Sequence, residues 1–398
     1  PDTLFAPGKI ILTPFLDAFW AGIMDTRHRK TLIDLLTLPT APLCEQYVTK
    51  YIHGWVRDRP DCHLKRDEYG NLRVHLRRGP AQRRPLLFSA HMDHPGFEAE
   101  RMLTPDRLLA RWRGWVAPEY FAGTRVRFYS NGRWIRGKVS STKTRVVRGR
   151  LRVQTATIAV RERVERGSIG VWDLPDPTVR GSRIYARGCD DVAGVAAVLC
   201  ALDVLRAGRM AVDVYALLTR GEELGWTGAI VACRSGILPR QARIVAVETS
   251  SELPGASVGE GPILRVGDST GTFTPGLTAF CHEVGLDLAR RDRSFKPRRK
   301  LMDGGSTETL PYLNAGHEAT GMCVALGNYH NMDRRRGRIG PEFIDLGDFA
   351  GLVRWFAALA RSRRSSDGLG QAVPMMVRRL DRTWASRLRR TADRVSGV

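Results

Sequence analysis

The sequence predicts an α/β fold in which a mixed, largely parallel sheet is flanked by helices and a small β-barrel domain is inserted into the chain. Short, largely apolar runs such as "VDVYALLT" and "RIVAVET" are typical of strands buried on both faces, as in parallel sheets. Between residues 100 and 176 the pattern changes to short alternating strands with turn signals such as Asn131-Gly132. That change is typical of an inserted barrel.

The elements before the insertion are two helices followed by strands. In "RKTLIDLLTLP" and "EQYVTKYIHGWV" the apolar residues recur at helical spacing, and the first run ends at Pro39. "NLRVHLRRG" alternates like a half-buried strand, and "PLLFSAHMD" begins as a short apolar strand. Residues 1–99 are therefore expected to form the first part of the α/β domain.

The elements after the insertion complete that domain and lead into a basic tail. "DVAGVAAVLCALDVL" predicts a buried helix, "GMCVALGN" a further strand and "LGDFAGLVRWFAALA" a closing helix, so residues 177–360 are assigned to the same domain. In the tail, 361–398, Met376, Leu380, Trp384 and Leu388 recur every four residues among many Arg residues. This predicts an amphipathic helix, which we expect to pack on its own subunit or a neighbour.

The composition favours some partners and settings over others. Lys plus Arg is 63 against 41 Asp plus Glu, a net charge of +22, which suits acidic partners. A basic nucleic-acid-binding protein is therefore an alternative, but we do not expect one, because no helix-turn-helix, RNA-binding aromatic motif or zinc finger is evident.

Seven cysteines without a C-x-x-C motif indicate a reducing, cytoplasmic setting. No apolar run reaches about 18 residues, and we expect no membrane partner.

Metal-binding residue types follow several of the apolar runs. The candidates are His91, Asp93, Glu222, Glu223, Glu248 and His330, together with Asp190 at the start of the buried helix. Because ligands gather at the carboxyl ends of the strands in open α/β sheets, these residues can converge on one edge. Each has a plainer interpretation: a hydrogen-bonded structural histidine at His91 and at His330, a common H-x-D pair at Asp93, a helix N-cap at Asp190-Asp191, an exposed strand end at Glu248, or a solvated loop at the two glutamates.

The number of candidates suits two divalent ions. One site would use His91, Asp190 and Glu248, and the other Asp190, Glu223 and His330, with Asp190 bridging the ions.

Two residues remain for catalytic roles. Asp93 is placed to orient the His91 imidazole. Glu222 is suited to act as general base toward a water that the metals activate. Imidazole and carboxylate ligands favour zinc, with cobalt or manganese as alternatives.

The motifs "SAHMDHPG", "GCDDVAG", "LLTRGEELGWTGA", "VAVET" and "GNYHNM" resemble the co-catalytic di-metal aminopeptidases of the glutamyl-aminopeptidase and tetrahedral-aminopeptidase type. The resemblance implies a zinc-peptidase/phosphorylase-like fold, removal of N-terminal residues from peptide substrates, and an inserted barrel that serves as a dimerisation domain. It also implies homo-oligomers from dimers to dodecamers. The chain departs from the family at Glu248, where Asp is usual, and at "GNYH", which lacks the usual Arg, so it looks like a divergent member.

A runner-up with the same chemistry is a deacylase or carboxypeptidase of the desuccinylase type, which accepts Glu at the third strand. Those enzymes generally carry an α/β insertion after the third metal strand. Here the insertion is β and precedes Asp190, which favours the aminopeptidase.

Overall fold

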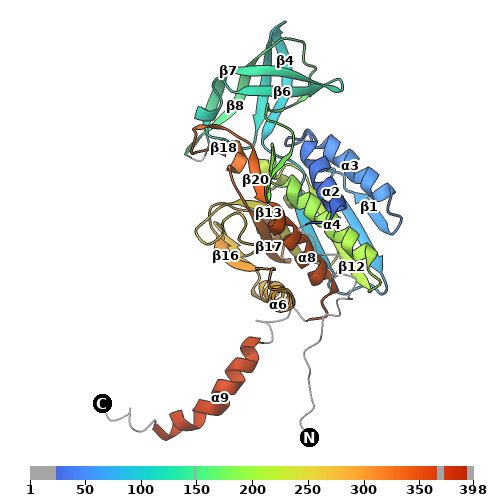
Figure 1. Ribbon diagram of the computed structural model, residues 1–398, viewed down its shortest axis with the longest axis vertical. Helices are drawn as coiled ribbons and strands as arrows, with labels where there is room; N and C mark the ends of the chain where they lie inside the picture. The colour runs from blue at the N-terminus through green and yellow to red at the C-terminus, as the bar shows by residue number, and fades with distance from the viewer. Residues whose placement is uncertain (1–23, 148, 365–371, 392–398) are drawn as a thin grey trace.

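The barrel, the α/β domain and a C-terminal helix follow one another along the long axis of the molecule (Figure 1). The structure, a computed structural model, describes residues 24–147, 149–364 and 372–391. The α/β domain lies in the middle, between the barrel and the C-terminal helix α9 (Ala372–Thr391). The predicted fold class is confirmed.

A nine-stranded mixed sheet forms the centre of the α/β domain. Its strands run in the order β1-β2-β12-β3-β13-β17-β14-β15, with β16 beside β14. The four central strands, β12, β3, β13 and β17, are parallel, whereas β2 and β14 join them antiparallel. The strand bounds are β1 Cys62–Arg66, β2 Leu72–Arg78, β3 Leu86–His91, β12 Val212–Thr219, β13 Arg243–Ser251, β14 Ile263–Asp268, β15 Gly271–Thr272, β16 Arg298–Met302 and β17 Glu318–Leu326.

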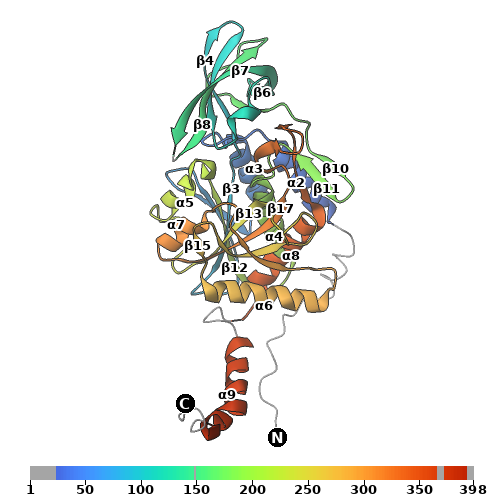
Figure 2. The ribbon, with the colours of Figure 1, turned by 90° about the vertical axis from the view of Figure 1, so that its left-hand side faces the viewer.

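Helices cover both faces of this sheet (Figure 2). One face shares a core with five helices: α2 Thr26–Thr37, α3 Gln46–Arg57, α4 Val192–Ala207, α6 Pro275–Arg291 and α8 Leu346–Arg361. The other face packs on the shorter helices α5 (Thr227–Ala232) and α7 (Thr309–Asn314). Helix α4 is buried on nearly every side, as its continuous apolar sequence predicts.

The inserted domain is a closed antiparallel barrel of six strands in the order β4-β5-β8-β7-β6-β9. Its strands are β4 Gly96–Thr104, β5 Arg107–Arg113, β6 Arg125–Ser130, β7 Arg133–Val147, β8 Arg150–Val160 and β9 Ile169–Trp172, with the short helix η1 Pro118–Tyr120 after β5. The barrel strands thus span 96–172, slightly earlier than the expected 100–176. The reason is that Phe97, which pairs with both β5 and β9, already belongs to the barrel core.

Short strands connect the barrel, the sheet and α8. They are β10 Thr178–Arg180, β11 Arg183–Ala186, β18 Met332–Asp333, β19 Arg338–Ile339 and β20 Glu342–Asp345. Strand β11 pairs with both β10 and β20. This small sheet brings the segment before α4 close to the segment after β17, and both of those segments carry predicted ligands.

Helix α9 stands apart from the rest of the molecule, beyond α6, in both views (Figures 1 and 2). Its apolar stripe is exposed: Met376 by 54%, Leu380 by 48%, Trp384 by 47% and Leu388 by 70%. Of the expectation that this stripe packs on its own subunit or a neighbour, the first half is therefore wrong for the single chain, and the second half stays a prediction. No helix in the described ranges is long and apolar enough to cross a membrane.

Candidate metal centre

The predicted ligands converge at the carboxyl edge of the four parallel strands. His91 is the last residue of β3, and Glu222 and Glu223 begin the short helix η2 (Glu222–Leu224) directly after β12. His330 lies in η3 (Tyr329–Asn331) after β17, and Asp190 stands just before α4. A sheet with parallel strands collects such residues at one edge.

Glu248 lies within its strand rather than at the strand's end. We expected the apolar run to stop there, but β13 continues to Ser251 because it pairs with β17 as far as Leu326. Its carboxylate still reaches the cluster, with Oε2 at 3.8 Å from His91 Nε2. Glu248 is 6% exposed, which argues against the alternative of a solvated strand end.

Two groups of three side chains are arranged as metal ligands would be. His91, Asp190 and Glu248 form one group, and Asp190, Glu223 and His330 form the other; within each, the ligand atoms lie within 4.8 Å of one another. Asp190 belongs to both groups. Its Oδ1 is 3.5 Å from His91 Nε2, and its Oδ2 is 3.5 Å from His330 Nε2. One carboxylate thus faces two sites, as a bridging ligand does.

Both imidazoles turn the same nitrogen toward the carboxylates. His91 Nδ1 lies 3.1 Å from the backbone oxygen of Asp93, and His330 Nδ1 lies 2.6 Å from the backbone oxygen of Trp115. A carbonyl oxygen can only accept, so Nδ1 is the donor in each ring. In the neutral ring, the form that binds a metal, Nε2 then carries the lone pair and faces the cluster, which is how metal-binding histidines are commonly held.

Asp190 also argues against the simple N-cap interpretation. Asp191 occupies the N-cap position of α4, yet its side chain makes no capping hydrogen bond. Within the described residues, Oδ1 of Asp190 and both carboxylate oxygens of Asp191 are buried and accept no hydrogen bond. Buried carboxylate oxygens without donors are costly, and a cation beside Asp190, which belongs to both ligand groups, would remove that cost for its Oδ1. The residues present therefore fit a metal pair.

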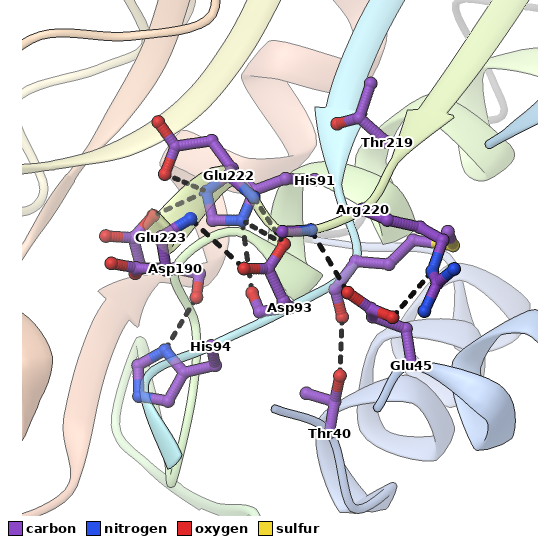
Figure 3. Close-up of polar contacts among 12 residues, drawn as sticks. Thr40, Glu45, His91, Asp93, His94, Asp190, Thr219, Arg220, Glu222 and Glu223 are labelled. Atoms are coloured by element: carbon purple, nitrogen blue, oxygen red, sulfur yellow. Dashed lines mark hydrogen bonds and ion pairs between the residues drawn. The ribbon is translucent and has the colours of Figure 1, made fainter. Parts of the chain in front are cut away.

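Glu222 is set apart from both ligand groups. It neighbours the cluster, with Oε2 at 3.9 Å from His91 Nε2. Asp93 fixes this loop, because its Oδ1 accepts the Glu222 N–H at 3.0 Å and its Oδ2 accepts the Glu223 N–H at 3.1 Å (Figure 3). Asp93 therefore contacts the His91 ring through its backbone oxygen and through Oδ1, which lies 3.6 Å from His91 Nδ1, and its carboxylate also positions the two glutamates.

The charges of the cluster are strongly interdependent. Burial raises the pKa of Glu222 well above its ordinary value, and burial likewise raises the pKa of Glu248 to about 7. Burial acts in the same direction on Asp190, but His330 and His91 outweigh it and hold the pKa of this carboxyl below its ordinary value. Burial would lower the pKa of both histidines, yet the surrounding carboxylates raise each pKa well above its usual range. The site is a buried cluster of carboxylates whose charge favours cations.

Glu342 holds the backbone of two predicted ligands and was not foreseen from the sequence. Its Oε1 accepts the His330 N–H at 2.7 Å, and its Oε2 accepts the N–H groups of Cys189 and Asp190 at 2.6 and 3.2 Å. His94 reinforces the same segment, because Nδ1 lies 2.7 Å from the Asp190 backbone oxygen. "PEFIDLGD" offers no local sign of this role, since Glu342 acts on residues far along the chain.

Glu45 performs a similar task for the glutamate loop. Its side chain accepts the N–H of Gly221 at 3.0 Å and a bond from Arg220 Nε at 2.7 Å (Figure 3). Gly221 has a positive φ of 61°, a conformation that glycine adopts without strain. This buried carboxylate lies between the two N-terminal helices, where the sequence suggested only a helix start.

A pocket opens onto the cluster of candidate metal ligands. The strand residues Thr249, Ser250 and Arg265 line it, together with the loop 304–307 and Tyr329. Arg265 is 3% exposed and donates from Nη1 to Ser250 Oγ and from Nη2 to the Met302 carbonyl, at 2.8 and 3.1 Å. Its Nε has no hydrogen-bond partner within the described residues. The sequence analysis did not single out this cation.

Comparisons with known proteins bear on most of the chain. A profile of the M42 glutamyl aminopeptidase family matches residues 70–331. No curated protein sequence matches significantly.

Solved structures are similar in fold. An aminopeptidase from the archaeon Desulfurococcus kamchatkensis is 21% identical with a TM-score of 0.69, and the match covers 86% of this chain and 96% of that one. The Pyrococcus horikoshii TET1 peptidase, which can assemble into a tetrahedron or a large octahedral shell, is 19% identical with a TM-score of 0.67 over 84% and 99% of the two chains. A TET aminopeptidase from a marine sediment archaeon, Thaumarchaeota, is 16% identical with a TM-score of 0.69 over 85% and 97%.

Proposed function

The chain belongs to the M42 glutamyl aminopeptidase family and is thereby a metal-dependent peptide hydrolase, and we propose that it removes N-terminal residues from peptides with two divalent ions. His91, Asp190 and Glu248 would hold one ion, and Asp190, Glu223 and His330 the other. The observation that carries this proposal is the placement of Asp190, whose two oxygens face two imidazole Nε2 atoms at 3.5 Å each. The desuccinylase-type and nucleic-acid-binding alternatives are not favoured, because the family match includes both ligand groups.

The donor set suits zinc, with cobalt or manganese as alternatives, because it combines imidazole nitrogens and carboxylate oxygens. When bound, the ions would polarise the scissile carbonyl and make a water more acidic. The chain's own contribution is to fix the ligands: Glu342 holds the backbone of Asp190 and His330. Carbonyl groups hold both imidazoles in the tautomer that leaves Nε2 for the metal.

Glu222 is the residue proposed to move the proton. It accepts a proton from the attacking water as the water oxygen bonds to the scissile carbonyl carbon. It then gives that proton to the leaving amide nitrogen as the C–N bond breaks, so the two products are a free amino acid and a shortened peptide. Burial favours the protonated form of Glu222, which suits the donating step, and nearby cations would favour the ionised form that the first step needs.

We further propose that the pocket prefers an acidic N-terminal residue. Of the described residues that line it, Arg265 is the single Lys or Arg. Its guanidinium is a buried cation at the pocket, and a substrate carboxylate bound beside it would pair with that charge. Arg265→Met is expected to lower kcat/KM for glutamyl substrates by about 10–100-fold and to leave leucyl substrates nearly unchanged.

Assembly and location complete the proposal. We propose that the chain forms homo-oligomers and that the barrel contributes to dimerisation, an assignment supported by the family and by the shells of the Pyrococcus horikoshii relative. All seven cysteines are free thiols and six of them are buried. This supports a reducing, cytoplasmic setting.

The test is hydrolysis of a panel of aminoacyl chromogenic substrates before and after chelation, with N-acetylated versions as the control. Chelated protein should be inactive, activity should return with added zinc or cobalt, and the acetylated substrates should not be cleaved. Cleavage of acetylated substrates at a similar rate would instead favour an acylase or endopeptidase and would overturn the proposal.

A further inference from the structure

Helix α9 carries an apolar stripe and a basic face on opposite sides. At about 100° per residue, Met376, Leu380, Trp384 and Leu388 fall within an arc of about 120°. Arg378, Arg382 and Arg389 lie across from the middle of that arc, whereas Arg379 and Arg390 lie beside it and Arg387 lies within it. The helix contains six Arg and one Asp, a net charge of +5, and the stripe is exposed along its length. From these features we infer that α9 binds the surface of an anionic membrane.

The first argument is the charge of the surface to which α9 binds. The chain has a net charge of +22, so a second copy presents a surface that on average repels α9. The large groove on the body, of about 1720 Å³ between α2, α3 and the end of α4, is lined by seven Lys or Arg and three Asp among its described residues. This groove therefore does not complement the helix, whereas an anionic lipid surface attracts each arginine.

The second argument is the spacing of the stripe. Two helices that pair along their length need apolar residues alternately three and four positions apart. In α9 the interval is four throughout, so the stripe drifts around the axis and two copies would keep contact only briefly. The acyl layer of a membrane is fluid and does not require a fixed spacing of apolar residues, so it accommodates the broad apolar arc of α9.

The third argument is the chemistry of the stripe residues. Trp384 lies in the middle of the stripe, and tryptophan is enriched at the boundary between hydrocarbon and water. The Arg387 guanidinium lies 4.9 Å from the centre of the Trp384 ring, a pairing that keeps a charge near the boundary. The remaining arginines have long stems and can reach headgroup phosphates while the stripe is buried at the acyl boundary.

The helix would thus lie on the membrane surface and not cross it, in keeping with the lack of a membrane-crossing helix in the described ranges. The candidate site lies at the end of the α/β domain that faces the barrel, because β3 ends at His91 and the barrel begins at Gly96, and α9 lies at the opposite end of that domain (Figure 1). Peptides at a membrane surface would then reach an enzyme that is held there by its C-terminal helix. This inference does not depend on the proposed peptidase activity.

The experiment is co-sedimentation of the full chain with vesicles of phosphatidylglycerol and phosphatidylcholine, compared with phosphatidylcholine alone. We expect binding to the anionic vesicles only, and its loss in the double variant Leu380→Ser/Trp384→Ser. Arg378→Gln/Arg379→Gln/Arg382→Gln should weaken the partition coefficient about 100-fold, at about fivefold per arginine. The matched control is Ile230→Ser/Leu286→Ser, which removes two exposed apolar side chains from the body and should bind as the parent does.

Light scattering tests the alternative that a neighbouring copy of the chain, and not a membrane, covers the stripe. If the double variant forms smaller assemblies than the parent, the stripe is covered by a neighbouring copy and the inference is overturned. It is also overturned if the parent ignores anionic vesicles, or if the double variant binds them as well as the parent. Unchanged assembly size together with lost vesicle binding supports it.

Discussion

Glu342→Gln tests whether a buried carboxylate positions the metal ligands. The carboxylate accepts three backbone N–H groups, from His330 on one oxygen and from Cys189 and Asp190 on the other. An amide keeps one accepting oxygen. The less costly orientation leaves that oxygen on Cys189 and Asp190 and turns the NH₂ group toward the His330 N–H. One buried donor then loses its acceptor, at about 1–3 kcal/mol of the free energy of unfolding.

The effect on metal binding should be unequal. His330 belongs only to the group with Glu223, so the ion in that group should bind about 10–100-fold more weakly, whereas the ion held by His91 and Glu248 should be little affected. Competition with a chromogenic chelator at pH 8 measures both affinities, above the pKa of Glu342, which burial raises to about 7. Glu162→Gln, on the exposed surface of the barrel, is the control. Equal weakening of both ions, or of neither, would refute the positioning role.

Three further predictions follow from other parts of the structure. Glu222→Gln should keep both metals and lose about 10²–10⁴-fold in kcat, whereas Glu223→Gln should lose the second metal; equal metal loss in the two variants would contradict the assigned roles. Burial raises the pKa of Asp348 from 3.8 to about 6, so the stability it contributes is present below about pH 4 and lost as pH rises through 6. Between pH 4 and 7 the free energy of unfolding of the parent, measured in urea, should therefore fall by about 2–3 kcal/mol more than that of Asp348→Asn. Parallel changes of the two free energies with pH would count against this. Replacing residues 100–176 by a short linker should give monomers by light scattering, and an intact chain that is itself monomeric would oppose the proposed role of the barrel.

The fold and the ligand groups could be read from the sequence because their signals are local. A buried parallel strand is a short apolar run, and the polar residue that follows it, such as His91, marks the carboxyl end of that strand. The barrel was recognisable for the same reason, since alternation and turn residues repeat within a few positions. Its boundaries were less accurate, because Phe97 joins the barrel through partners far along the chain.

The supporting residues could not be predicted, because their partners are distant. Glu342 contacts Asp190, and Glu45 contacts Gly221, across more than a hundred residues of sequence. The residues next to each glutamate in the sequence do not indicate that its side chain is buried. For the tail, the apolar stripe of α9 could be predicted from the spacing of its residues. The surface that covers the stripe could not be predicted, because it depends on charge and on the rest of the molecule.

Metal titration of the chelated protein tests the central claim most directly. Zinc or cobalt is added in fractions of an equivalent per chain, and hydrolysis of a glutamyl substrate is followed together with the bound metal. The arrangement around Asp190 predicts that binding is complete at two ions per chain and that full activity requires both. Full activity at a single bound ion, or in protein that contains no metal, would contradict it.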